Sequence, residues 1–392
     1  MMKSDKIQTA DKLTQVKTYY FASKLKEIAA LNASGQDIIN LGIGSPDMAP
    51  PEKVIQTLTQ SLSLPKAHQY QSYYGLSELR AAFADFYSQH FKVNLDFRDE
   101  VLPLIGSKEG VMHIAMSFLN AGDEVLVPNP GYPAYKMTTL LAGGVPLYYD
   151  LKASTDWKPD FEALNKLDLS KVKLMWVNYP NMPTGQRGNK VLFEQLVAFG
   201  KKHQILICHD NPYAFILNDQ PLSILSVPGA MDTCLELTSL SKSFNMAGWR
   251  VGAVLGAVRY LKSIIKFKSN MDSGMFLPIQ YAAAEALRSE VSWFNGLNKL
   301  YEKRRVLAWK IYDLLSVSYN KDSAGLFVWG KVSNKSGEAW SEALLNQARV
   351  FVTPGFIFGD NGADYLRISL CTPLERMEEA LERIVSAKMI LS

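Results

Sequence analysis

Between Pro51 and Ile279, short apolar runs alternate with segments of helical periodicity, and this alternation restricts the possible folds more than any other feature. Most runs are apolar throughout, as is typical of strands buried on both faces of a parallel sheet. The pattern therefore predicts an α/β fold with an open, mostly parallel sheet flanked by helices. The predicted strands are Glu124–Val127, Pro146–Tyr149, Lys173–Val177, Ile205–Cys208, Leu235–Thr238 and Val251–Leu255, and the helices between them are Glu109–Leu119, Ala134–Leu141 and Lys190–His203.

The last third of the chain has a different pattern, which predicts a smaller α+β lobe. An N-terminal helix at Phe21–Leu31 is expected to pack on the same lobe, because Ile39–Pro51 is rich in Gly and Pro and resembles a crossing segment. We predict a large domain at 48–285 and a small, discontinuous domain at 1–47 and 286–392. The predicted elements of the last third are helices Phe276–Leu287, Asn295–Ser316 and Leu374–Ala387 and strands Leu326–Trp329, Val350–Thr353 and Tyr365–Ser369.

Charge and cysteine content exclude several classes of protein. Forty-two Lys and Arg against 38 Asp and Glu leave a net charge of +4, too little for a nucleic-acid surface. Cys208, Cys234 and Cys371 lie far apart and form no CxxC, which predicts neither disulfides nor a metal cluster. The N-terminus has no apolar signal segment, and the longest uncharged apolar stretch, Val251–Val258, is far below the roughly 20 residues of a membrane span. We expect a cytoplasmic protein with no membrane contact.

One candidate anion site is Gly106-Ser107-Lys108-Glu109-Gly110, which follows the apolar run Val101–Ile105 and opens a helix. The N–H groups and the positive dipole end of a helix N-terminus suit a phosphate. The segment is not a Walker A loop, which needs GxxxxGK[ST]. Taken alone, the segment is better explained as an ordinary strand-to-helix turn capped by Ser107.

Asp210 follows the apolar run Ile205–Cys208, and Tyr213 comes three residues later. Residues at the carboxyl ends of strands in an open α/β sheet line the ligand crevice. Cys208 and His209 precede Asp210, but adjacent side chains of a strand point to opposite faces, which disfavours a metal site.

The richest local cluster is the segment from Thr238 to Gly252, where a strand is followed by Ser239, Ser241 and Lys242, and then by Arg250. A lysine among groups that oppose its charge can act as a nucleophile toward carbonyls, and the serines with Arg250 would form an anion site beside it. A solvated loop lysine is the usual alternative. Ser239 and Lys242 also match SxxK, but the SDN and KTG motifs of penicillin-binding proteins are absent from the sequence.

Arg367 lies within an apolar strand pattern near the C-terminus. A buried guanidinium is costly unless it is paired. The pattern indicates either a structural salt bridge or a bidentate site for a substrate carboxylate.

In this order and spacing, these segments closely resemble the class I/II aminotransferases, which are pyridoxal-phosphate enzymes of fold type I. The resemblance covers almost the whole chain and implies a mostly parallel, seven-stranded sheet in the large lobe. It implies an enzyme that moves an amino group from an L-amino acid to a 2-oxo acid, and a homodimer with shared active sites. The matching segments are Leu41–Asp47, Tyr70 with Tyr74–Leu76 and Leu79-Arg80, Gly106–Gly110, Asn129–Pro133, Pro183–Gly185, Asp210 with Tyr213, Ser239–Gly252 and Tyr365–Ser369.

The resemblance also assigns roles around pyridoxal 5′-phosphate. Lys242 would form the internal aldimine and then shuttle a proton. Asp210 would pair with the pyridine nitrogen, Tyr213 would donate to the ring O3′, and Tyr132 would stack on the ring. Arg367 would bind the substrate carboxylate near Gly44. The phosphate would be bound by Gly106, Ser107, Lys108, Ser239, Ser241, Arg250 and, from the neighbouring subunit, Tyr70.

The sequence departs from the family pattern at one position. The family usually has Asn directly before Pro-Thr-Gly, where its amide bonds the cofactor O3′, but here the residue is Met182. Either the neighbouring Asn181 substitutes toward cofactor and substrate, or O3′ depends on Tyr213 alone. Losing that donor predicts a more basic aldimine than in relatives with the Asn.

Two other functions remain open at this point. The anchor motifs do not separate an aminotransferase from a carbon–sulfur β-lyase of the same fold type. A non-catalytic effector-binding module is disfavoured because Lys242, Asp210 and Arg367 are all present. Aromatic, methionine-like, acidic and diaminopimelate-type amino donors are all compatible with the sequence.

Overall fold

Seven strands form one mixed sheet in the order β2-β8-β7-β6-β5-β3-β4. The computed structural model describes residues 7–16 and 20–387. β8 is antiparallel to both of its neighbours, and the other paired strands run parallel to each other. The predicted mostly parallel, seven-stranded sheet is therefore confirmed. Its strands are β2 (Val101–Leu104), β3 (Glu124–Asn129), β4 (Val145–Asp150), β5 (Val172–Val177), β6 (Leu206–Asp210), β7 (Cys234–Ser239) and β8 (Gly252–Gly256).

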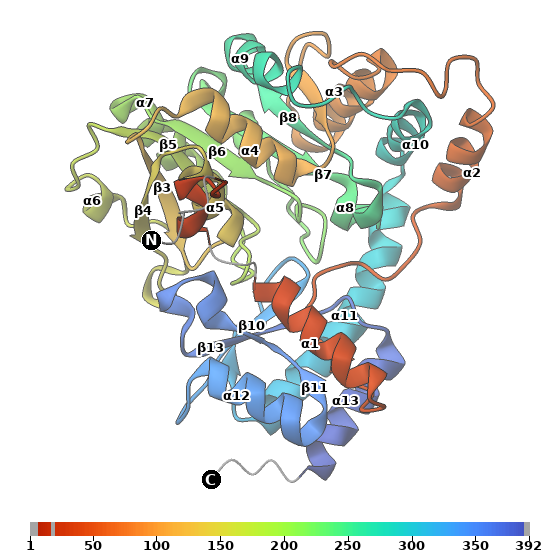
Figure 1. Ribbon diagram of the computed structural model, residues 1–392, viewed down its shortest axis with the longest axis vertical. Helices are drawn as coiled ribbons and strands as arrows, with labels where there is room; N and C mark the ends of the chain where they lie inside the picture. The colour runs from red at the N-terminus through yellow and green to blue at the C-terminus, as the bar shows by residue number, and fades with distance from the viewer. Residues whose placement is uncertain (1–6, 17–19, 388–392) are drawn as a thin grey trace.

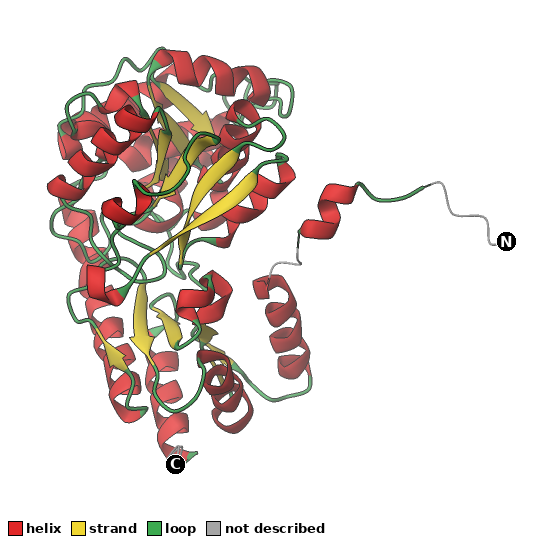
Figure 2. Ribbon diagram, turned by 90° about the vertical axis from the view of Figure 1, so that its left-hand side faces the viewer, coloured by secondary structure: helices red, strands yellow, loops and turns green. Residues whose placement is uncertain are grey.

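Helices cover both faces of this sheet, as Figures 1 and 2 show. Successive strand residues point to opposite faces, so Leu174 and Trp176 of β5 pack with one helix layer and Met175 and Val177 with the other. The first layer contains α4 (Ser107–Phe118), α5 (Pro133–Leu141) and α9 (Val258–Lys268). The second contains α2 (Glu52–Ser61), α3 (Ser77–Phe91), α7 (Lys190–His203) and α10 (Leu277–Leu287).

A second group of elements combines both ends of the described chain. Phe21 of α1 shares an apolar core with residues of the C-terminal helices and strands, and Figure 1 shows α1 beside them. The domain boundaries stay a prediction. The antiparallel sheet here has the order β12-β13-β10-β9. The elements are α1 (Tyr20–Ala33), α11 (Val291–Leu314), α12 (Gly337–Ala343), α13 (Leu374–Ser386), β9 (Ser318–Tyr319), β10 (Phe327–Lys331), β12 (Thr353–Pro354) and β13 (Tyr365–Ser369).

Two expectations about this part of the chain are wrong. The predicted strand Val350–Thr353 is two short strands in different sheets, β11 (Val350–Phe351) and β12. The crossing segment Ile39–Pro51 begins with a strand, β1 (Ile39–Asn40), which pairs in parallel with β11. Because β11 pairs with β1 and Thr353 pairs with Arg367 of β13, the chain changes partners at Val352.

Candidate functional site

A cavity of about 350 Å³ lies where the carboxyl ends of β5, β6 and β7 meet the segment Ile43-Gly44, α1 and β13. Eleven of the residues predicted from the sequence line it. These are Gly44, Ser107, Lys108, Tyr132, Asp210, Tyr213, Ser239, Ser241, Lys242, Arg250 and Arg367. Parallel strands end at one edge of a sheet, which brings residues from distant parts of the chain together.

Asp210, the last residue of β6, is buried with one of its carboxylate oxygens unpaired. Oδ2 accepts a hydrogen bond from the Tyr135 hydroxyl at 2.9 Å, whereas Oδ1 has no hydrogen-bond partner among the described residues. Burial raises the pKa of Asp210 to about 6, against the hydrogen bond from Tyr135. A buried oxygen of this kind calls for a donor, and a protonated ring nitrogen would satisfy it.

Tyr135 fixes the orientation of this carboxylate. Its ring lies parallel to that of Trp176 at a centroid distance of 4.9 Å, and both side chains are fully buried. Burial, with Asp210 adding to it, raises the pKa of the Tyr135 phenol well above its usual range, so the hydroxyl remains a donor. The sequence prediction missed Tyr135, although it lies three residues after Tyr132 at the start of α5.

Lys242 lies in α8 (Leu240–Ser243), the short helix that directly follows β7. Its Nζ donates a hydrogen bond to the Gly44 carbonyl at 2.5 Å. Burial lowers the pKa of Lys242, and the charges of Arg367 and Arg250 lower it further while Cys371 opposes them. A lowered pKa increases the fraction of neutral amine, the form that attacks a carbonyl carbon.

Ser107 and Lys108 at the N-terminus of α4, together with Ser239, Ser241 and Arg250, form an anion cradle in the wall of the cavity. Gly106 has φ +86°, in the left-handed region that favours glycine, and a Cβ at this position would lie 2.2 Å from Arg250 Nη2. Gly106 itself therefore lies behind the lining. Arg250 Nη1 lies 3.5 Å from Ser241 Oγ and donates to the Ala247 carbonyl at 2.9 Å. Helix N–H groups, hydroxyls and a guanidinium form a donor set suited to a phosphate.

Arg367 extends from β13 into the other end of the cavity. Its Nη2 donates to the Gly42 carbonyl at 2.7 Å, and Nη1 lies 3.3 Å from the Met182 sulfur. The guanidinium carbon lies 3.8 Å from the ring centre of Phe327 and 4.7 Å from that of Phe358. Aromatic faces hold a guanidinium in place while leaving its charge for a carboxylate.

Met182 occupies the lining position, and Asn181 does not. The Asn181 Oδ1 accepts from the Thr184 hydroxyl at 2.8 Å, and its Nδ2 donates to the Asn178 carbonyl at 3.2 Å. The amide that lines the cavity is Asn178, which the sequence prediction missed. It donates to the Asp210 carbonyl at 2.6 Å and accepts from the Met182 N–H at 2.7 Å. Asn178 directly follows the apolar strand β5, and this position is the sequence signal that could have identified it.

Tyr70 is the third predicted residue, after Gly106 and Asn181, that does not line the cavity. Its side chain is 91% exposed, beside Ser273–Phe276 on the surface. Nothing within the described part of the chain covers that exposed ring. A residue that acts on a neighbouring subunit has to be exposed in this way.

One group of possible metal ligands lies outside the cavity. Ligand atoms of Glu109, His113 and Asp272 lie within 4.8 Å of one another. The Lys268 ammonium lies 2.5 Å from Asp272, where it already supplies a positive charge. We therefore assign these side chains to the packing of α4 against α9.

Comparison with known proteins identifies the family. The family model of the aminotransferases of class I and II matches residues 36–384, and the chain belongs to this family. An LL-diaminopimelate aminotransferase of Natranaerobius thermophilus is 39% identical over 381 residues, 96% of this chain and 99% of that protein. One from Nitratidesulfovibrio vulgaris is 38% identical over 96% and 98% of the two chains. Substrate-bound BacF from Bacillus subtilis is 32% identical with a TM-score of 0.92, over 97% of this chain and 98% of that one.

The chain is therefore a transaminase, with pyridoxal 5′-phosphate as cofactor and an amino acid and a 2-oxo acid as substrates. The residues present fit this cofactor, because the cavity joins an unpaired buried carboxylate oxygen, an amine and an anion cradle. Within the described residues, no helix combines the length and apolar character needed to cross a bilayer.

Proposed function

We propose that Lys242, Asp210 and Arg367 are the central residues of the transamination site. The observation that supports this is their meeting in one cavity from three distant parts of the chain. Pyridoxal phosphate, when bound, withdraws electrons from the substrate α-carbon and carries the amino group between the two half-reactions. Lys242 Nζ would hold the cofactor, and the same amine would take the proton from the substrate α-carbon.

The other lining residues hold the cofactor in the orientation that this proton transfer needs. Asp210 Oδ1 would accept from the protonated ring nitrogen, Tyr213 would donate to the ring oxygen, and Tyr132 would cover the ring. The phosphate takes charge-assisted hydrogen bonds, which contribute about 1.5–3 kcal/mol each, from the cradle at the start of α4 and α8. The cradle residues are Ser107, Lys108, Ser239, Ser241 and Arg250.

Arg367 binds the α-carboxylate of the substrate beside Gly44. We expect Arg367→Lys to lower kcat/KM roughly 10²–10³-fold, because breaking a buried, hydrogen-bonded charge pair costs about 2–5 kcal/mol. The loss should be largely in KM, with the cofactor still bound. The exposed Arg288→Lys is the matched control. Unchanged steady-state kinetics in Arg367→Lys would show that the substrate carboxylate does not bind at Arg367.

Met182 leaves the cofactor O3′ without an amide donor from this position. A donor would stabilise the deprotonated form of the bound cofactor, so Met182→Asn should shift the pH midpoint of its absorbance change downward relative to the natural chain. The measurement is a spectroscopic pH titration of both holoenzymes. An equal or higher midpoint in Met182→Asn contradicts the assignment.

For the amino donor we propose a diaminopimelate-type substrate, with LL-diaminopimelate as the first compound to test. The support is the 36–39% identity, over 96–97% of this chain, to proteins of that activity. A second candidate is a donor with an apolar side chain, because Phe21, Leu25, Ile43 and Phe358 line the cavity on the Arg367 side. A panel of donors with 2-oxoglutarate, followed by glutamate formation, separates the two: the preferred donor has the highest kcat/KM.

We further propose a homodimer in which Tyr70 reaches the phosphate of the partner subunit's site. Tyr70 is almost fully exposed within one subunit and lies away from the cavity of its own chain. Mixing and refolding Tyr70→Ala with Lys242→Ala chains should then restore activity above that of either variant alone, because one site of each hybrid dimer is intact. A mixture no more active than its components would place Tyr70 at its own subunit's site or at none.

A cytoplasmic location also remains a proposal. Its support is that Cys208, Cys234 and Cys371 are all buried and free.

A further inference from the structure

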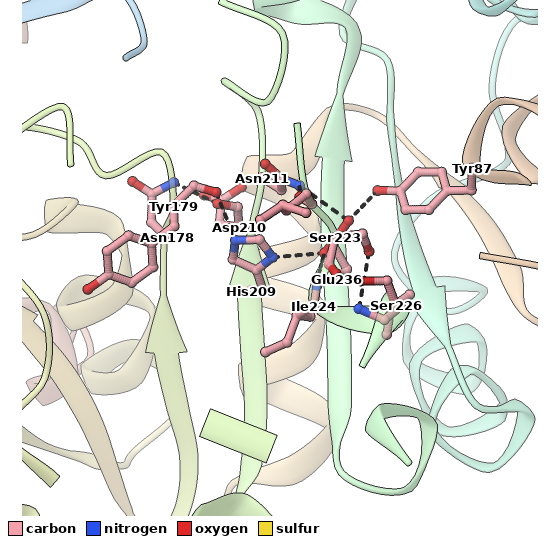
Figure 3. A network of polar contacts seen from close by, with 12 residues as sticks. Tyr87, Asn178, Tyr179, His209, Asp210, Asn211, Ser223, Ile224, Ser226 and Glu236 are labelled. Carbon is pink, nitrogen blue, oxygen red and sulfur yellow. Dashed lines mark hydrogen bonds and ion pairs between the residues drawn. The ribbon is translucent and has the colours of Figure 1, made fainter. Parts of the chain in front are cut away.

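A buried polar network that includes His209 and Glu236 lies beside Asp210 (Figure 3). Adjacent residues of a strand point to opposite faces, so His209 points toward α3 and α7 while Asp210 points toward α5. His209, Glu236 of β7 and Tyr87 of α3 have no solvent-exposed surface. Charged and polar groups are this deeply buried only when they are paired. The hydrogen-bond partners of each group therefore indicate where the protons and charges of the network lie.

Both ring nitrogens of His209 contact hydrogen-bond acceptors. Nε2 lies 3.0 Å from the Tyr179 carbonyl oxygen, and Nδ1 lies 2.8 Å from Glu236 Oε2. A carbonyl oxygen only accepts, so Nε2 must carry a hydrogen, and a neutral imidazole has no second one for Nδ1. A further proton therefore lies between Nδ1 and Oε2.

The other contacts of Glu236 place this proton on His209. Glu236 Oε1 accepts from the Tyr87 hydroxyl at 2.6 Å and from Asn211 Nδ2 at 3.4 Å, and Oε2 accepts from the Ile224 N–H at 3.0 Å. Several donors to one carboxyl group favour its charged form. Burial, with Glu236 adding to it, raises the pKa of the Tyr87 phenol well above its usual range, so Tyr87 remains a donor. His209 is therefore the imidazolium of a buried ion pair.

The groups that face His209 come from four elements. β7 supplies Glu236, α3 supplies Tyr87 through Glu236, and the segment after β5 supplies the Tyr179 carbonyl. The Phe193 ring of α7 packs edge-on with its centroid 5.0 Å from that of the imidazole. On β6 itself the neighbour is Asp210. Burial raises the pKa of Asp210 to about 6, and Glu236 adds to the rise, while Tyr135, then His209 and Lys242 oppose it.

We propose that His209 is a positioning residue whose imidazolium, held by Glu236 and the Tyr179 carbonyl, keeps the neighbouring Asp210 carboxylate ionised. This proposal rests on the role proposed above for Asp210, because only a charged carboxylate forms an ion pair with a protonated ring nitrogen. Within the cavity, Tyr135 and Lys242 also favour the ionised form of Asp210. His209 adds a positive charge from the other face of the sheet, where neither cofactor nor substrate can reach.

The first test observes His209 directly in the cofactor-free full-length chain. Nitrogen-15 labelling of the histidine side chains gives signals from five residues, and the signal missing from the His209→Asn spectrum identifies His209. We expect both ring nitrogens to carry a proton at neutral pH, because each of them faces a hydrogen-bond acceptor. A neutral tautomer in this spectrum overturns the proposal.

The second test measures the effect on Asp210 through the binding of pyridoxine 5′-phosphate, which has the ring nitrogen but no aldehyde to react with Lys242. In the natural chain, affinity should fall as the pH decreases through about 6, where Asp210 takes up a proton. In His209→Asn the midpoint should rise by about one pH unit, because a positive charge beside Asp210 is lost while the amide can still donate to Glu236. The ligand's own titration cancels between the two proteins.

Two further variants keep the test decisive. His209→Gln, whose amide extends toward the Tyr179 carbonyl, replaces His209→Asn if that chain does not fold, with the same expected shift. Tyr87→Phe removes one hydrogen bond to Glu236 but retains the ion pair, and its midpoint should remain that of the natural chain. An unshifted midpoint in folded His209 variants overturns the proposal. If Asp210→Asn binds the ligand and turns over normally, the proposed function fails instead, whatever the state of His209.

Discussion

Replacing Lys242 by alanine is expected to lower kcat for transamination by at least about 10⁴-fold. The variant loses the group that we propose both binds the cofactor and takes the α-proton, and general acid–base catalysis alone contributes about 10²–10⁴-fold. The visible absorbance of the purified protein should disappear on dialysis, because only non-covalent contacts of the cradle would then hold the cofactor. Single-turnover and steady-state kinetics with the preferred donor measure the loss.

Lys262→Ala is the matched control, because Lys262 is an exposed lysine of α9 outside the cavity. It should retain the activity and colour of the natural chain. Full activity in Lys242→Ala would show that another group carries out the proton transfer.

Asp210→Asn is expected to lower kcat roughly 10³-fold, the magnitude typical of removing one preorganised electrostatic partner from a buried active site. The amide preserves the shape of the side chain and can still bond Tyr135, but it lacks the charge that we propose holds the cofactor's ring nitrogen protonated. The remaining enzyme should also bind the cofactor more weakly, which titration of the apoenzyme measures.

The exposed Asp85→Asn on α3 controls for the loss of one carboxylate from the chain and should behave like the natural enzyme. If Asp210→Asn retained kcat within a few-fold, the unpaired Oδ1 would have some other partner in the working enzyme.

The sequence predicted the elements of the large sheet well, because their signal is local. Apolar runs bounded by turn residues mark β3 to β8, and the observed strands lie within a few residues of the predicted ones. The split of Val350–Thr353 had no such signal. It depends on β1, more than 300 positions earlier in the chain, competing with β13 for the same short apolar run.

The site could be predicted wherever a motif carries its chemistry within a few residues. Lys242, Asp210 and Arg367 each follow or interrupt an apolar strand, and all three line the cavity. Tyr135 and Asn178 were missed because their roles arise only from tertiary packing: a stack on Trp176 for Tyr135, and a bond to the Asp210 carbonyl for Asn178. Asn181 is the opposite case: the sequence suggested it as a site residue, but its amide oxygen accepts from the Thr184 hydroxyl within its own turn.

The charge state of His209 has the same origin. In the sequence, Cys208-His209-Asp210 invites a metal site, and the alternation of side chains along a strand argues against it. Only the structure reveals that His209 faces Glu236, 27 residues away on the neighbouring strand, while the adjacent Asp210 faces Tyr135 on the other side of β6.

The most direct test of the central claim is to identify the lysine that carries the cofactor. Reduction of the holoenzyme with borohydride fixes the cofactor covalently to its lysine, and peptide mass mapping then locates the added mass. The account predicts a single modified peptide that contains Lys242, and no modification in the Lys242→Ala chain treated in the same way. Stoichiometric modification of any other lysine would contradict it.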